Sequence, residues 1–165
     1  MADVLQIKLD GIDALKAALS DVSEKIRKRA IRGALRDAAR VIQTAARTAA
    51  PVLAAPTARR SPGTVRRNIV VRPSKFARRQ GDEGVYVSVR GIRGKVRVAR
   101  LGKAGASNPN DPYYWRFLEF GTRKMAARPF LGPAARSKGE EAIRIFMARV
   151  VPQIERLNRK SPGVR

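Results

Sequence analysis

Apolar residues recur at helical spacing between residues 21 and 49, which predicts one long amphipathic helix. Asp21 and Glu24 resemble a capping box at its start, and Pro51 must end it because proline lacks an amide proton. Many of the apolar positions are alanine, so this helix needs a closely packed partner surface. The apolar face holds Ile31, Leu35, Ala38, Ile42, Ala45 and Ala49, and the opposite face holds Lys25, Arg29, Arg32, Arg36, Arg40 and Arg47.

A second helical pattern covers residues 134–158, and Pro152 within it predicts a kink or a break. The segment 113–122 is the most aromatic part of the chain and predicts a short helix ended by Gly121. Residues 123–133 predict an extended segment with Phe130 and Leu131 as buried anchors. The apolar stripe of the second long helix is Ile143, Phe146, Met147, Val150 and Ile154.

Alternating apolar and polar residues predict short strands at residues 3–9, 65–72, 85–89 and 95–100. The turn signal Gly91–Gly94 joins the last two of these into a predicted β-hairpin. A short helix is expected at residues 14–19. Proline, glycine and basic residues predict loops at residues 51–64, 73–84 and 102–112.

These elements predict the α+β class: a long N-terminal helix and a C-terminal helix packed on a small, mostly antiparallel β-sheet with extended basic loops. We expect residues 1–158 to form a single domain and residues 159–165 a basic tail. No apolar stretch approaches the roughly 18 residues of a membrane span, and acids within residues 1–10 argue against a secretory signal. We therefore expect a protein of the cytoplasm rather than of a membrane.

Composition excludes several kinds of chemistry. The 165 residues include 36 Lys or Arg and 13 Asp or Glu, for a net charge of +23, with no histidine and no cysteine. Disulfides, Cys/His zinc sites and imidazole bases are therefore excluded. The adjacent acid pairs Asp82–Glu83 and Glu140–Glu141 do not converge on one metal ion by themselves. We expect a protein that is not an enzyme and that uses no metal or cofactor.

Basic residues concentrate in the middle of the chain, where residues 38–110 hold sixteen Lys or Arg and two acids. This density favours contact with nucleic acid or an acidic protein surface over a merely solvated face. No base-reading module is recognisable, so contact with DNA is expected through phosphates. The candidate contact residues are Arg59, Arg60, Arg66, Arg67, Arg78, Arg79, Arg93, Lys95, Arg97 and Arg100.

The most specific motif lies between residues 113 and 134. Glu119-Phe120-Gly121-Thr122, followed by Arg128-Pro129-Phe130-Leu131-Gly132-Pro133-Ala134, resembles the hallmark of the tail-component family of long-tailed bacteriophages. These tail-completion or neck proteins are grouped with the minor tail protein Z of phage lambda. The resemblance extends over residues 5 to about 150, with a departure at Val65 and Asn68. The motif residues expected in the core or at a subunit seam are Trp115, Phe117, Glu119, Phe120, Gly121, Thr122, Pro129, Phe130, Leu131 and Pro133.

The resemblance implies a structural virion protein of the head–tail junction, made in the host cytoplasm. Such a protein forms a homo-oligomeric ring that joins or completes the tail around the DNA channel. Its implied partners are neighbouring neck and tail proteins of the head-closure, tail-terminator or tail-tube type, with non-specific contact to phage DNA. We further expect Glu119, an acid in a basic region, to form an ion pair with an arginine of this chain or of a neighbour.

Two other functions stay open on the sequence. A ribosomal or nucleoid-like protein that binds nucleic acid without reading its sequence would show tight, steeply salt-dependent binding as a free monomer. An assembly chaperone would be absent from finished particles. Neither alternative explains the aromatic segment around Glu119-Phe120-Gly121-Thr122.

Overall fold

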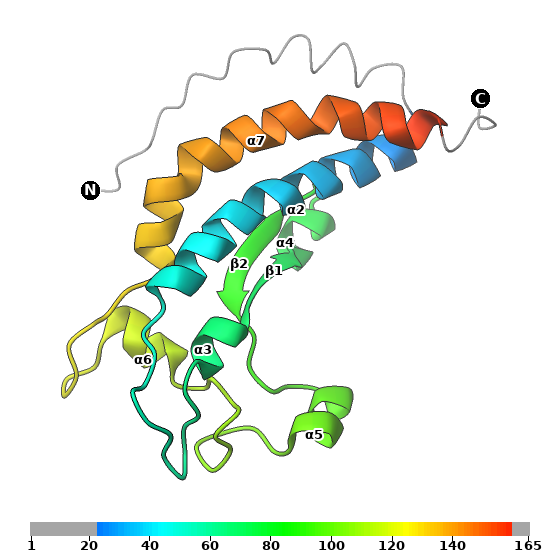
Figure 1. Cartoon of the computed structure of the whole chain (residues 1–165). Helices are drawn as coiled ribbons and strands as arrows, with labels where there is room; N and C mark the ends of the chain where they lie inside the picture. The colour runs from blue at the N-terminus through cyan, green and yellow to red at the C-terminus, as the bar shows by residue number, and fades with distance from the viewer. Residues whose placement is uncertain (1–22, 160–165) are drawn as a thin grey trace. The chain divides into compact units, whose positions relative to one another are not determined.

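The computed structural model describes residues 23–159 and confirms the α+β class (Figure 1). The expected strand at 3–9, the helix at 14–19, the cap at Asp21 and most of the basic tail lie outside the described residues. The elements in chain order are α2 (Glu24–Ala49), α3 (Thr64–Arg67), β1 (Ile69–Pro73), α4 (Lys75–Arg79), β2 (Val85–Val89), α5 (Lys95–Leu101), α6 (Trp115–Phe120) and α7 (Leu131–Arg159).

The described chain divides into two compact units, which are considered separately. Unit 1 holds residues 23–38, 73–85 and 140–159, and unit 2 holds residues 39–72 and 86–139. Both long helices contribute to both units, α2 by its two halves and α7 by its first turns and its remainder. The single domain over residues 1–158 therefore stays a prediction.

Unit 1 is built on two helices that run antiparallel, the first half of α2 and the later part of α7 (Figure 1). Its buried cluster joins the small side chains of Ala30 and Ala34 to Val150, Ile154 and Leu157. Both alanines are fully buried, so the absence of larger side chains brings the two helices close together. The alanine-rich helix therefore packs closely on another helix of this chain, as its small side chains allow.

The buried face of α2 includes Ala38 of the predicted stripe, but it lies one residue earlier than the stripe before Ala38 and one residue later after it. The most buried positions are Ala30, Ala34, Ala38, Ala39 and Ala46. Among the predicted positions, Ile31, Leu35, Ile42 and Ala45 are half-buried flanks, whereas Ala49 is exposed, so that position was wrong. The reason is that alanines fit where the helix axis is nearest its partners, and the larger side chains occupy the edges of the contact.

Unit 2 contains the sheet, which is a single antiparallel pair of β1 and β2. The Arg90 amide donates to the Asn68 carbonyl at 2.8 Å, and this bond closes the ladder at one end. The second half of α2 covers the strands, since the Gln43 and Arg47 side chains both donate to the Ile69 carbonyl. The core around them consists of Ala46, Ala50, Val65, Ile69, Val89, Tyr114, Phe130 and Ala134.

The predicted hairpin of residues 85–89 and 95–100 is wrong, because β2 pairs with β1 and residues 95–101 form α5. Positive φ values at Gly94 and Gly102 bracket this helix. A six-residue alternation of Val, Arg and Ala is equally compatible with helix, and Arg and Ala favour helix. None of the residues of α5 is buried, so the alternation of apolar and polar residues in this segment does not mark a buried face.

Two other segments assigned to strand or loop contain short helices. The predicted strand at 65–72 begins as α3, because Gly63 adopts φ 70° and the Asn68 side chain donates to the Thr64 carbonyl. The predicted loop at 73–84 contains α4, whose first turn is capped when Ser74 Oγ accepts from the Ala77 amide at 3.2 Å. The predicted end of α2 before Pro51, the strand β2 and the loop at 102–112 are confirmed.

One ion pair holds the α4 region against α2 within unit 1. Arg32 Nε donates to Glu83 Oε2 at 2.8 Å, and Arg32 Nη2 donates to Glu83 Oε1. The Glu83 side chain is 8% exposed and the Arg32 side chain 37% exposed. These hydrogen bonds from Arg32 lower the pKa of the Glu83 carboxyl, and the same bonds raise the pKa of Arg32. The pair is bidentate, the geometry in which such a contact stabilises most.

Replacing Glu83 by glutamine is expected to lower the free energy of unfolding at neutral pH by about 1–2 kcal/mol, a value reduced by the exposure of Arg32. Because the native pKa is lowered, this stabilisation is present above the ordinary value of 4.5 and is lost as the pH falls through the native pKa. Urea unfolding of both proteins across a pH series measures the difference, which is expected to shrink in acid.

The matched control is Glu24→Gln, which breaks the exposed i,i+4 pair between Glu24 and Lys28. This pair is solvated, so its loss is expected to change stability much less. A stability gap for Glu83→Gln that persists undiminished in acid, or that Glu24→Gln reproduces, would contradict the assignment.

Candidate functional site

The helix α6 and the loop after it carry most of the aromatic motif. Gly121 ends the helix with φ 72° and ψ −177°, as the sequence predicted. A Cβ at this position would lie 2.9 Å from the Ala127 nitrogen and 3.0 Å from the Met125 carbonyl oxygen. The loop folds back because the Arg128 amide donates to the Leu118 carbonyl at 2.7 Å. Glycine is therefore required both by the backbone angle and by the close approach of the returning chain.

Glu119 connects this helix to the start of α7. Its carboxylate is buried, and Oε2 accepts from the amides of Phe130 and Leu131 at 2.9 and 3.0 Å, while Oε1 accepts from the Gly132 amide at 2.8 Å. These are the amides that a helix leaves without internal partners at its N-terminus. A negative charge at that end of the helix is also favoured by the helix dipole.

The ion pair expected between Glu119 and an arginine of this chain is not what the described residues show, because its carboxylate accepts from three backbone amides. An ion pair with an arginine of a neighbouring subunit stays a prediction. The error has a physical origin. Surrounding basic residues suggested a guanidinium partner, but the amides of a helix N-terminus provide the same positive charge without a side chain.

The residues after Phe130 fit this cap. A Cβ on Gly132 would lie 3.3 Å from Glu119 Oε1, so the missing side chain lets the carboxylate approach the amide. Pro133 follows, and it has no amide proton that could be left without a partner. Phe130 itself is fully buried in the core of unit 2, which confirms it as an anchor, and Leu131 packs against the same core. The two parts of the motif are thus joined physically.

Some motif residues have no role in this arrangement. Phe117 is 48% exposed and Phe120 is 75% exposed, and their spacing of three residues places them on one side of α6. Met125, in the turn closed by the Thr122 and Met125 backbone bonds, is also exposed. Trp115 packs partly against the core with the Arg116 guanidinium over its ring, and Pro129 is exposed. The outward aromatic pair Phe117 and Phe120 is called the aromatic pair below.

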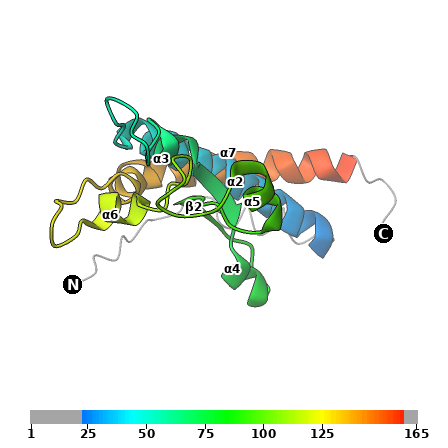
Figure 2. The ribbon, with the colours of Figure 1, turned by 90° about the horizontal axis from the view of Figure 1, so that it is seen from below.

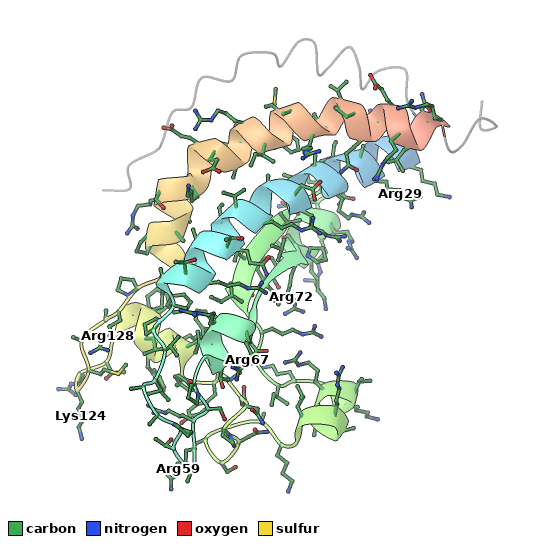
Figure 3. The ribbon with its side chains drawn as sticks, viewed as in Figure 1. Arg29, Arg59, Arg67, Arg72, Lys124 and Arg128 are labelled. Carbon is green, nitrogen blue, oxygen red and sulfur yellow. The ribbon has the colours of Figure 1, made fainter. Side chains whose placement is uncertain are left out.

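The candidate basic residues are spread over both units. In unit 2 they lie on the loop before α3, on α3 itself and around α5, and Figure 3 shows Arg59 at the tip of that loop and Arg67 on α3. In both views, α6 and α5 lie on either side of α3 (Figures 1 and 2). Arg60 lies with its guanidinium 4.8 Å from the centre of the Tyr114 ring. In unit 1, Arg78 and Arg79 are exposed on α4.

Three of these candidates converge on one cavity of about 460 Å³ in unit 2, called the arginine cavity below. Arg67 comes from α3 and Arg97 and Arg100 from α5, and Arg90 joins them from the end of β2. None of the residues that line it is acidic; the remaining ones are Thr64, Asn68, Val96, Leu101 and Asn110. The arginine cavity therefore has the composition of an anion site.

A second arginine-lined cavity, of about 370 Å³, lies in unit 1 between α2 and α7, with Arg29, Arg36 and Arg156 among its lining residues. It also includes Arg32, whose charge is already matched by Glu83. Within residues 23–159 no group of three or more acidic side chains is placed to hold a metal ion. None of the helices in that range combines the length and hydrophobicity that a membrane crossing requires.

Sequence reasoning missed two polar residues that organise unit 2. Asp111 is buried and accepts from the amides of Ile92 and Gly105 at 3.2 and 2.7 Å, which holds the loop after α5 against the end of β2. Arg90 was not among the candidate contacts, although it lines the arginine cavity. A lone acid in a strongly basic stretch was the available signal for Asp111; Arg90 had none beyond its charge.

Replacing Glu119 by glutamine is expected to lower the free energy of unfolding by about 1–3 kcal/mol, because an amide nitrogen would face one of the donors and the charge at the helix end is lost. Urea unfolding of the variant against the wild type measures this. Glu140→Gln is the control, since Glu140 is an exposed acid on α7, the helix that Glu119 caps. Equal effects of the two substitutions would contradict the capping role.

Gly121→Ala is expected to cost about 2 kcal/mol or more, from a backbone conformation that is nearly exclusive to glycine and from the contacts with Ala127 and Met125. Gly81→Ala is the matched control, because Gly81 has φ 85° but open space around it, so backbone strain alone remains. Thermal unfolding should separate the two variants. If both lose the same stability, the close approach at Gly121 is not what requires glycine.

The comparisons with known proteins agree with the motif. A family model described as "Bacteriophage HK97-gp10, putative tail-component" matches residues 13–121, which is about two thirds of the chain. The match ends at Gly121, so it includes Glu119 but not the amides that Glu119 caps. No curated protein and no solved structure matches the chain. The grouping with protein Z of phage lambda stays a prediction. The chain belongs to the HK97-gp10-like family of bacteriophage tail components.

Proposed function

We propose that this tail component is a structural subunit of the head–tail junction, where it assembles as a ring that completes the tail or joins it to the head. Membership in the tail-component family supports a structural role in the virion. The proposal adds the ring and its place at the neck. Its neighbours would be head-closure, tail-terminator or tail-tube proteins.

The aromatic pair is the observation that carries the proposal. Glu119, Gly121 and Phe130 of the same motif are explained by the fold of one subunit, whereas Phe117 and Phe120 are left facing solvent on α6. Exposed aromatic side chains on one helix face mark a protein interface more often than a random surface. In a closed ring, each subunit would cover this face with its neighbour.

The charge of the chain fits a ring that surrounds DNA. A net charge of +23 on 165 residues opposes self-association unless anions are nearby. A polyanion on the ring axis, or acidic rings above and below, would supply that compensation. We place the basic loops and the α5 region at these contacts.

The mass of the purified chain in solution, measured by light scattering with and without short duplex DNA across a salt series, tests the ring. A mass of several subunits supports the proposal. A monomer that binds duplex DNA with a Kd below about 1 μM in ~150 mM salt, tighter than common non-specific binding, favours the alternative of a nucleic-acid-binding protein that reads no sequence.

Phe120→Asp is expected to reduce the oligomer to smaller species, because a charge in a buried seam carries a large desolvation penalty. Phe76→Asp is the matched control, since Phe76 is 72% exposed on α4 and Phe120 75% exposed on α6. Light scattering of both variants reports the mass, and circular dichroism confirms that each is folded. Loss of the oligomer in Phe76→Asp but not in Phe120→Asp would place the seam elsewhere.

A further inference from the structure

The arginine cavity gathers positive charge from three separate elements of unit 2. Arg67, Arg90, Arg97 and Arg100 line a space of about 460 Å³, and no acidic residue lines it. Two of them are fixed by neutral partners: Arg67 Nη1 donates to the Pro62 carbonyl at 2.8 Å, and Arg97 Nη2 donates to Asn68 Oδ1 at 3.2 Å. These bonds orient the guanidinium groups without neutralising them.

Arg97 is the least satisfied group of the cavity. Its Nε is buried and has no hydrogen-bond partner within the described residues. Burial lowers the pKa of Arg97, and the charges of Arg90 and Arg100 lower it further, while Asp111 offsets part of this effect. Asp111 is itself engaged by two backbone amides. A buried donor without a partner costs free energy, so the folded chain holds Arg97 in a state that an anion would relieve.

The two arginine-lined cavities differ in whether a carboxylate of the chain contacts their arginines. In unit 1, Arg32 is neutralised by the bidentate contact with Glu83, and Arg156 donates to Gln153. In the arginine cavity of unit 2 no carboxylate plays the part of Glu83. The chain therefore supplies a carboxylate to Arg32 in the unit 1 cavity, whereas no carboxylate lines the arginine cavity.

From this contrast we propose that the arginine cavity of unit 2 is a phosphate-binding site that takes a backbone phosphate of duplex DNA. Arginine guanidinium groups match phosphate oxygens in bidentate geometry, and several of them can engage one phosphate together. The side-chain amides of Asn68 and Asn110 at the cavity add N–H donors for phosphate oxygens. No base-specific contact is needed, in keeping with contacts that position a protein without reading sequence.

DNA is favoured over an acidic protein by the surroundings of the cavity. Arg66 lies on α3 and Lys95 on α5, the two helices that supply most of the cavity, and Arg93 precedes α5 on the loop after β2. Arg59 lies on the loop before α3, so successive phosphates of one DNA backbone could meet successive cations. This inference rests on the proposed function in one respect, because the ring is what would bring DNA to the cavity. Phosphate binding by the cavity can nevertheless be measured whether or not a ring forms.

The test compares Arg97→Met with Arg36→Met in the full chain. Both substitutions remove one positive charge and keep the aliphatic volume, but Arg36 lines the cavity of unit 1. Arg97→Met is expected to melt close to the wild type in phosphate-free buffer, since the loss of the neutral bond to Asn68 is offset by removal of a buried donor without a partner. This thermal measurement confirms that any loss of binding is not a loss of fold.

Two binding readouts follow. Inorganic phosphate is expected to raise the melting temperature of the wild type more than chloride at equal ionic strength, and Arg97→Met is expected to abolish this difference. Fluorescence anisotropy with a short labelled duplex across a salt series is expected to show weaker binding for Arg97→Met, with the slope of log K against log salt smaller by about 1. Arg36→Met should retain the phosphate effect and lose less DNA affinity.

Equal losses for the two variants would overturn the proposal, because the DNA would then be held by diffuse charge. Stabilisation by phosphate without any change in DNA affinity for Arg97→Met would also overturn it, since the cavity would then serve another phosphate source. Light scattering of the same variants separates this proposal from the ring. If Arg97→Met keeps the mass of the wild type but binds DNA more weakly, the result supports the phosphate site independently of the ring. If the wild type is a monomer that still binds phosphate and DNA through the arginine cavity, the result contradicts the ring but not the phosphate site.

Discussion

Unit 2 depends on the hydrogen bonds between the Glu119 carboxylate and the first backbone amides of α7. The carboxylate accepts from three amides at the start of α7 and so joins the aromatic helix α6 to the segment that places Phe130 in the core. Gly121 lets the chain turn back, Gly132 lets the carboxylate approach, and Pro133 leaves no spare donor. The motif of residues 119–134 is thus one physical unit, in which a carboxylate on α6 caps the start of α7.

Compensation of charge follows the same logic elsewhere in the chain. Glu83 neutralises Arg32, and Asp111 holds two loop amides, so these buried acids serve structure. With 13 acids against 36 basic residues, most arginines must find other partners. Aromatic rings supply some, as for Arg60 over Tyr114, and backbone carbonyls supply others. Some positive charge has no partner of this kind, above all at Arg97, whose buried Nε lacks an acceptor. In our proposal an anion from outside the chain compensates it.

The sequence predicted the elements that rest on long periodicity or on a single stereochemical requirement. The long helices, the end of α2 before Pro51, the strand β2 and the Gly121 cap belong to this group. Residues 95–100 were misread because six residues satisfy strand and helix patterns equally, and their helix buries nothing. The partner of Glu119 could not be predicted, since backbone amides have no sequence signature. The arginine cavity was equally hidden, because its residues come from three elements that only the fold brings together.

Amide hydrogen exchange at residues 130–132 tests the central claim most directly. The first amides of a helix normally exchange quickly because they lack intrahelical partners. If the Glu119 carboxylate holds them, the amides of Phe130, Leu131 and Gly132 should be protected in the native chain as strongly as those of the core strands. Rapid exchange at all three positions, in a chain whose β1 and β2 amides are protected, would show that the cap does not hold α6 and α7 together.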